Sequence, residues 1–85
     1  MTPLLPVRVM VTDAWDEVPL QLSAGTTLGE LKRQALVATR VTRDPSGYLV
    51  KYRGAELADG LSLADAGVVP NAGLIVLSRK RRPVR

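Results

Sequence analysis

The sequence contains no cysteine and no histidine among its 85 residues. Because cysteine is absent, the chain has neither a disulfide nor a thiolate metal site, and the absence of histidine removes the commonest general base and metal ligand. The segment from Met1 to Pro6 has no basic residue and no apolar run long enough for a signal peptide or a membrane span. We therefore expect a cytoplasmic protein that carries no metal or cofactor.

Motifs for catalysis are missing as well. The serines have no histidine to activate them, and the sequence holds no glycine-rich phosphate loop. The lysines Lys32, Lys51 and Lys80 show no sequence pattern of burial, and Lys32 and Lys51 are candidates for accepting a covalent modifier. The sequence thus favours a protein that is not an enzyme.

Positive charge is concentrated near the C-terminal end. The formal net charge is +4, from 12 basic and 8 acidic residues. Five of the basic residues lie within residues 79–85, where no acidic residue is present, so residues 1–78 hold seven basic and eight acidic groups and a net charge of −1. A chain of this length holds one domain. We divide it into a flexible N-terminal extension (1–6), a globular domain (7–78) and a basic tail (79–85).

Alternating apolar residues predict four β-strands. Residues 7–13 place a valine at every second position, residues 18–22 alternate in the same way, and the short connection between them predicts a β-hairpin. Pro19 has no N–H for a sheet ladder and therefore indicates an edge strand. Two further strands are expected around Val50 and Leu74.

A helix is expected from about Thr27 to Thr39. Thr27 and Glu30 match a capping box, in which the threonine hydroxyl accepts a bond from a first-turn amide and the glutamate reaches back to the cap. Apolar residues then recur at spacings of three and four, which gives the helix one face to pack on the sheet. These residues are Leu28, Leu31, Ala35 and Ala38.

The strands and the helix can bury their apolar faces together only if the helix packs across one face of a mixed sheet. This argument predicts an α+β protein with the β-grasp architecture, in which a mixed sheet of four or five strands packs on one helix. The predicted core contains Val9, Val11, Leu20, Leu28, Leu31, Val50 and Leu74.

The middle of the sequence resembles ubiquitin. The string from Gly54 to Asp65 reads Gly-Ala-Glu-Leu-Ala-Asp-Gly-Leu-Ser-Leu-Ala-Asp and resembles the ubiquitin-like β-grasp family. The matched positions in it are Gly54, Leu57, Asp59, Gly60, Leu63 and Asp65. The resemblance extends from about Val7 to Arg82 and implies the same fold as the pattern of strands and helix. Further matched positions are Thr27, Leu28, Leu31, Val68, Leu74 and Val76.

The C-terminal segment departs from that family. Ubiquitin-like modifiers and related sulfur carriers end in two glycines, because the terminal carboxylate must enter a narrow activating site. Arg82 and Pro83 occupy the matching positions here. The resemblance therefore implies a ubiquitin-like protein without the terminal diglycine. In this respect the chain is similar to small bacterial proteins associated with type VII secretion, with which it shares the turn from Leu63 to Val68.

Partner binding in this family uses an apolar patch on the outward face of the sheet. The resemblance places Leu49, Lys51, Ile75 and Leu77 on that face, so that a lysine replaces the central isoleucine of the patch. Single apolar residues are also ordinary on protein surfaces. The functional interpretation is a docking face for a protein with an acidic group opposite Lys51, or for a second copy of the chain.

Trp15 is the only tryptophan and lies in the predicted hairpin loop, close to where ubiquitin has another patch residue. We expect it to fold back over the core, and we keep it as a candidate anchor for a partner because aromatic residues are enriched at binding hot spots. Asp13, Asp16 and Glu17 surround it. Their spacing is more typical of a solvated turn than of a calcium loop.

The basic tail adds a salt-dependent attraction to the phosphate groups of nucleic acid or of an anionic membrane. No aromatic residue lies within it, so base stacking is not implied. We expect only a weak contact of this kind, since charges after a final strand also serve solubility. The cationic residues are Arg79, Lys80, Arg81, Arg82 and Arg85.

Three functions are consistent with the sequence. The first is a non-catalytic ubiquitin-like interaction module, bacterial in origin, that acts non-covalently in secretion or in another multi-protein assembly. The second is an atypical protein modifier of a bacterial conjugation system, and the third is a β-grasp subunit that regulates an enzyme complex. We favour the first, because the resemblance covers the fold but not the terminus.

Overall fold

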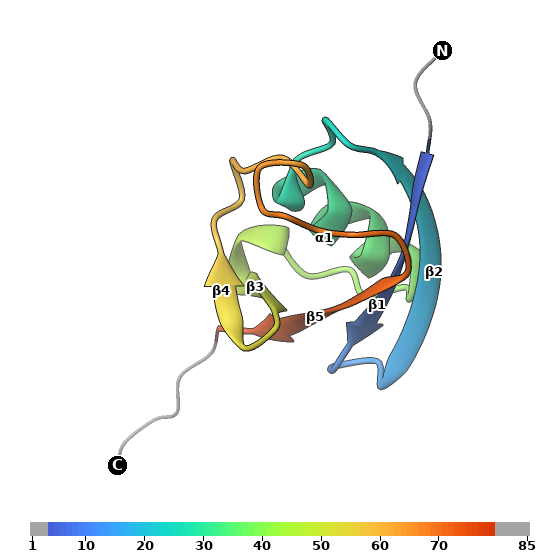
Figure 1. Cartoon of the computed structure of the whole chain (residues 1–85). Helices are drawn as coiled ribbons and strands as arrows, with labels where there is room; N and C mark the ends of the chain where they lie inside the picture. Colours follow the sequence, from blue (N-terminus) through green and yellow to red (C-terminus); the bar gives the residue numbers. More distant parts are fainter. Residues whose placement is uncertain (1–3, 80–85) are drawn as a thin grey trace.

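An N-terminal hairpin, a helix and three further strands build the protein (Figure 1). The computed structural model describes residues 4–79. In chain order the elements are β1 (Leu4–Val11), β2 (Asp16–Ser23), α1 (Leu28–Ala38), the 3₁₀ turn η1 (Pro45–Gly47), β3 (Tyr48–Tyr52), β4 (Ala55–Leu57) and β5 (Ala72–Ser78).

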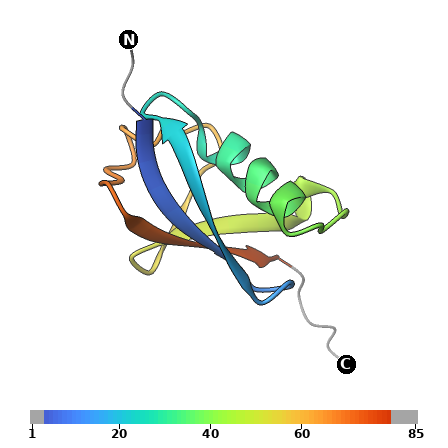
Figure 2. The same ribbon diagram turned by 90° about the vertical axis from the view of Figure 1, so that its right-hand side faces the viewer.

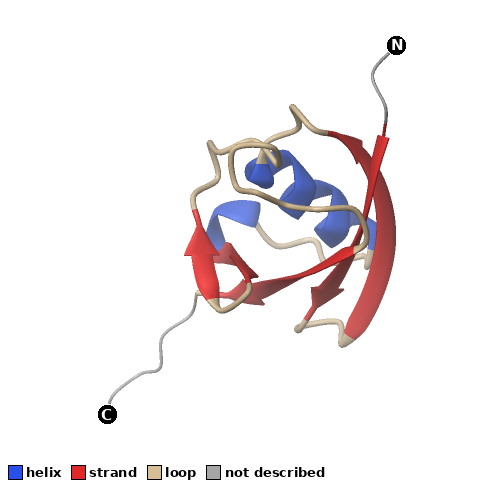
Figure 3. Ribbon diagram, viewed as in Figure 1, coloured by secondary structure: helices blue, strands red, loops and turns tan. Residues whose placement is uncertain are grey.

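The strands form one five-stranded sheet in the order β2-β1-β5-β3-β4. β1 pairs with β5 in parallel, whereas the other neighbours are antiparallel, so the sheet is mixed. α1 crosses one face of the sheet (Figure 2), and within the described residues no helix covers the other face (Figure 3). This arrangement confirms the predicted α+β fold of the β-grasp type.

β1 starts earlier than the sequence pattern indicates. Leu4 pairs with Ser23, and the ladder between β1 and β2 continues from there without a break to Val11. Leu4 is 58% exposed, so the start of the strand has no buried residue that would reveal it in the sequence. The predicted flexible extension over residues 1–6 is therefore wrong for residues 4–6. Pro19 is exposed on β2, the outermost strand, which confirms its prediction as an edge residue.

α1 begins after Thr27, whose hydroxyl accepts a hydrogen bond of 3.2 Å from the amide of Glu30. Only this half of the predicted capping box forms, because the Glu30 carboxylate accepts bonds from Arg33 and Gln34 further along the helix. Other amides of the first turn donate to backbone carbonyls of the loop after β4. The helix has 11 residues. No helix in the described part of the chain is long and apolar enough to cross a membrane.

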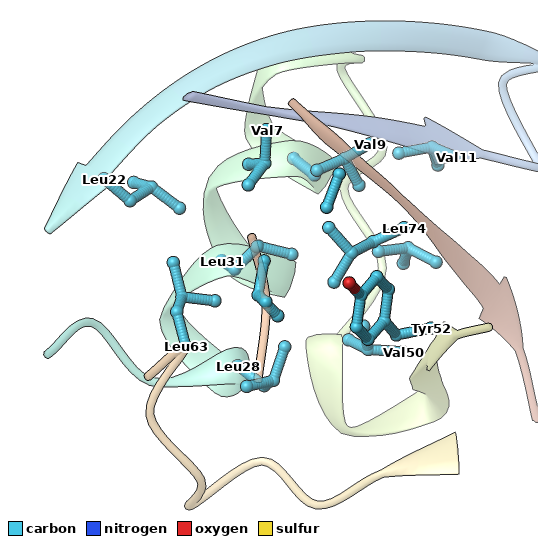
Figure 4. Close-up of a cluster of buried hydrophobic side chains, with 14 of the residues drawn as sticks. Val7, Val9, Val11, Leu22, Leu28, Leu31, Val50, Tyr52, Leu63 and Leu74 are labelled. Atoms are coloured by element: carbon cyan, nitrogen blue, oxygen red, sulfur yellow. The ribbon is translucent and has the colours of Figure 1, made fainter. Parts of the chain in front are cut away.

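The core lies between α1 and the sheet (Figure 4). The helix buries Lys32 and Leu36, whereas Ala38, which the predicted stripe included, is exposed. With 3.6 residues per turn, the face that contains Leu28 passes through positions 32 and 36 rather than 38. Leu20 is only partly buried because it lies on the edge strand. The buried apolar residues are Val7, Val9, Val11, Leu22, Leu28, Leu31, Ala35, Leu36, Tyr48, Val50, Tyr52, Leu63, Val68, Ala72, Leu74 and Val76.

Candidate protein-binding surface

The sheet face opposite the helix carries the four residues predicted from the sequence, three of them apolar and one basic. Leu49 lies directly opposite Leu77, and Lys51 directly opposite Ile75, on the neighbouring strands β3 and β5. The residues between them in sequence, Val50 among them, are buried toward α1, and side chains alternate between the two faces of a strand. Leu49, Lys51, Ile75 and Leu77, called the outer patch below, therefore form one continuous surface.

The outer patch has an apolar centre and a charged border. Met10 of β1 pairs with Ile75 and extends the apolar strip across a third strand. On one side Arg8 and Glu17 form an ion pair of 3.6 Å, and on the other side Glu56 of β4 lies opposite Lys51. Such an arrangement of apolar centre and polar rim is typical of protein interfaces.

Lys51 is the one cation among the four residues of the outer patch. Glu56, its neighbour on β4, forms its ion pair with Arg79 at 3.5 Å, and Lys51 itself makes no ion pair with a residue of 4–79. Its ammonium group is therefore available to a carboxylate from outside the chain.

Trp15 does not fold back over the core, so that expectation was wrong. The side chain lies at the tip of the β1–β2 hairpin and is 78% exposed. Its backbone has φ of 52°, in the left-handed region that residues with a Cβ atom avoid. The tryptophan thus carries two costs at one position, since both its apolar surface and its backbone conformation are unfavourable there. Residues held in strained conformations that do not help the fold are common at functional sites.

The hairpin tip is held in place by a contact that the sequence analysis missed. The Tyr48 hydroxyl donates a hydrogen bond of 2.6 Å to the Asp13 carboxylate, and Arg43 approaches the same carboxylate at 3.5 Å. Tyr48 is almost fully buried, and burial together with the bond to Asp13 raises the pKa of its hydroxyl. In the sequence only its alternation with Val50 marked Tyr48 as inward-facing. Nothing there indicated that its hydroxyl reaches the hairpin.

Trp15 lies beyond one end of the outer patch. The amide of Thr12, in the same turn, donates to the carbonyl of Val76 at 3.0 Å, and Leu77 is the next residue. The four patch residues are thus brought together, and the turn that carries Trp15 follows β1 at the end of the sheet where Val76 and Leu77 lie, outside the patch itself. The acidic residues near Trp15 form no metal site, and no group of three or more metal-binding side chains occurs within residues 4–79.

Lys32 has a structural role, contrary to the sequence analysis. The residue is 1% exposed, and its ammonium group donates to the Tyr48 carbonyl at 2.9 Å and to the Asp59 carboxylate at 2.8 Å. It joins α1 to the start of β3 and to the loop after β4. Because the amine is buried and bonded, Lys32 is no candidate for accepting a modifier.

Arg79, which the sequence analysis assigned to the basic tail, contacts the folded domain. Its amide donates to the Gly47 carbonyl at 2.8 Å and its guanidinium to the Ser46 carbonyl at 3.3 Å, in addition to the ion pair with Glu56. Arg79 therefore closes the border of the outer patch. Lys80, Arg81, Arg82 and Arg85 lie outside the described residues.

The fold is similar to solved ubiquitin-like structures over nearly its whole length. Ubiquitin from Caldiarchaeum subterraneum superposes with a TM-score of 0.78 at 15% identity, covering 94% of this chain and 99% of that one. A protein designed on the basis of ubiquitin gives 0.80 at 19% identity, with 98% of each chain covered. An N-terminal ubiquitin-like domain gives 0.77 at 15% identity, covering 100% of this chain and 84% of that one.

These likenesses show the fold and no more, because the sequence identities are low. The chain has the ubiquitin-like fold, with a five-stranded mixed sheet packed against one helix. No model of a protein family matches the sequence, and a comparison with curated proteins gives no match either.

Proposed function

We propose that this module binds a protein partner non-covalently through the outer patch, with Trp15 as an additional anchor, and that it performs no catalysis. The observation that carries the proposal is the outer patch itself, two residue pairs on adjacent strands with a lysine that has no ionic partner within the described chain. The partner should present apolar side chains around a carboxylate. A bacterial secretion or multi-protein assembly is the setting we propose for it.

The exposed tryptophan supports binding near the hairpin tip. A tryptophan that stays exposed in a left-handed conformation contributes little to the fold, yet tryptophan is among the residues most enriched at interface hot spots. The bond between Tyr48 and Asp13 fixes the turn before a partner arrives. A fixed turn lowers the entropy that binding would otherwise lose.

Non-covalent action is proposed because of residues 82 and 83. Arg82 and Pro83 stand where ubiquitin-like modifiers carry two glycines, and both are too bulky for the narrow site in which such a terminus is activated. A species of higher mass that survives denaturing conditions and contains this chain bonded to a lysine would instead support the alternative, an atypical modifier.

Affinity capture from extracts of the cells that produce this protein tests the proposal. The wild type should retain a specific protein, and Leu49→Ala combined with Ile75→Ala should release it. Lys51→Gln should weaken capture as well. Glutamine is preferable to glutamate at this position, because Glu56 lies opposite and a second carboxylate would repel it across the strands.

The control is Val69→Ala, which truncates an exposed apolar residue outside the outer patch. It should leave capture unchanged, as should removal of residues 80–85 at physiological salt. The proposal would be overturned if the variant with Leu49→Ala and Ile75→Ala still retained the partner while the chain without residues 80–85 lost it. That result would show that the tail recognises the partner.

A further inference from the structure

A concave surface lies at the C-terminal end of α1. It is a groove of about 340 Å³, formed by the last turns of α1 and by the loop that leads to η1. Figure 2 shows this end of the helix beside that loop, on the helix side of the sheet. The groove is therefore separate from the outer patch, which lies on the other face.

The floor of the groove is apolar. Leu36 lies buried at its base, Val41 and Pro45 form one wall, and Val37 stands at the surface with 64% of its area exposed. Exposed helix positions are normally polar, so a valine here leaves an apolar side chain without cover from the rest of the described chain. The floor can accept an aliphatic side chain from a partner.

The rim of the groove is cationic. Arg33, Arg40 and Arg43 line it, and no carboxylate lines it. Arg33 is held by Glu30, and Arg43 lies 3.5 Å from Asp13. Arg40 makes no ion pair with any residue between 4 and 79.

Arg40 is also in an unfavourable backbone conformation. Its φ is 64°, at the position directly after a helix where glycine is the common residue. An arginine here brings strain without forming an ion pair inside the described chain. It does, however, place one unpaired guanidinium beside the exposed Val37.

We propose that this groove binds an extended acidic peptide segment in which an aliphatic residue lies midway between two carboxylates. Arg33 and Val37 are four residues apart and therefore lie on one side of α1. Arg40, two residues beyond the end of the helix, lines the same groove. Carboxylates four positions apart in an extended peptide are separated by about 13 Å and share one face with the residue between them. The long side chains of Arg33 and Arg40 would each reach one of these carboxylates from the rim of the groove.

A peptide fits this groove better than a nucleic acid does. Single-stranded nucleic acids use aromatic platforms for their bases, and no aromatic residue lines the groove. A phosphate backbone would contact the rim, but it has no aliphatic group for the floor. The acidic peptide satisfies both features.

A synthetic peptide with the core Glu-Ser-Leu-Ser-Glu, blocked at both ends, is the probe. Titrated into the millimolar range against the isotope-labelled protein, it should shift the amide resonances of residues 33–44 and leave those of the outer patch unchanged. Replacing both glutamates by glutamine, or the leucine by serine, should abolish the shifts. A lysine version should not bind.

Two pairs of variants locate the site. Arg40→Gly should weaken binding about fivefold, the effect of one lost exposed ion pair. Its control is Arg53→Gly, which also removes an arginine from a left-handed position, with φ of 55°, but far from the groove. Val37→Ser should abolish binding, whereas Val69→Ser, at another exposed valine, should not.

The proposal is overturned if the acidic peptide causes no shifts, if the glutamine peptide binds equally well, or if the shifts fall on the outer patch. If Arg40→Gly and Arg53→Gly lowered the affinity for the peptide equally, the effect would come from net charge alone, and the proposal would also be overturned. Amide shifts at residues 33–44 with a short single-stranded RNA or with anionic vesicles, but not with the peptide, would assign the groove to phosphate instead.

Discussion

Replacing Arg40 by glycine should stabilise the protein. The amide of Arg40 donates to the Val37 carbonyl and the amide of Val41 to the Leu36 carbonyl, which is the Schellman arrangement at a helix C-terminus. Arg40 is the left-handed residue of this motif, with φ of 64°. Glycine adopts this conformation without a steric clash, whereas arginine does not.

The size of the gain follows from three terms. Relief of the left-handed backbone contributes about 1–2 kcal/mol, and the greater freedom of glycine in the unfolded chain offsets about 0.5–1 kcal/mol of it. Burial contributes little, because Arg40 is exposed and has no ion pair to lose among the described residues. The net gain is therefore about 0–1.5 kcal/mol, and its central value of about 0.75 kcal/mol corresponds to an increase of roughly 3–6 °C in Tm for a domain of this size.

Thermal and urea unfolding followed by far-ultraviolet circular dichroism would measure this gain. Arg40→Ala is the matched control, since it removes the same charge but keeps the Cβ atom, and it should not raise the free energy of unfolding. A glycine variant less stable than the wild type, or an alanine variant that gains as much, would refute the strain argument.

Two further substitutions test the electrostatic contacts. Asp59→Ala should lower the free energy of unfolding by about 2 kcal/mol, which is less than for a fully buried ion pair because the Asp59 carboxylate is half exposed. Adding Lys32→Met to this variant should recover part of the loss, as measured by urea unfolding. If the losses from the two substitutions simply add, the two side chains are not coupled. The bonds from Arg33 and Gln34 lower the pKa of Glu30 from 4.5 to about 2. Because this pKa is lowered in the folded state, the ionised Glu30 stabilises the fold above pH 4.5, and this stabilisation is lost as the pH falls toward 2. The difference in urea midpoint between the wild type and Glu30→Gln should therefore shrink between pH 4.5 and pH 2. A difference that stays constant would contradict the assignment.

Much of the fold could be predicted because its determinants are local. Thr27 marks the helix start through a hydrogen bond to a residue three positions away, and alternation identifies β3 and β5 without any knowledge of their neighbours. The same alternation assigns Leu49, Lys51, Ile75 and Leu77 to the outward face. The resemblance to ubiquitin then supplies the order of the strands, which local patterns do not contain.

The remaining features depend on contacts between distant segments. Lys32 is buried because Tyr48 and Asp59 provide acceptors 16 and 27 residues away. Trp15 is exposed because the turn takes a left-handed residue at that point and the core is already filled by other side chains. The groove likewise needs α1 and the following loop to be folded before Val37 and Arg40 lie beside each other. No pattern in the sequence marks these positions.

The exposed position of Trp15 makes the protein its own optical reporter. Because the chain has one tryptophan and that side chain is already in water, its fluorescence should change little when the protein unfolds. Tyr48 and Tyr52, by contrast, are buried and should respond to unfolding. A shift of the tryptophan emission to shorter wavelength should therefore signal the arrival of a partner at the hairpin tip, without any label and without interference from the folding equilibrium.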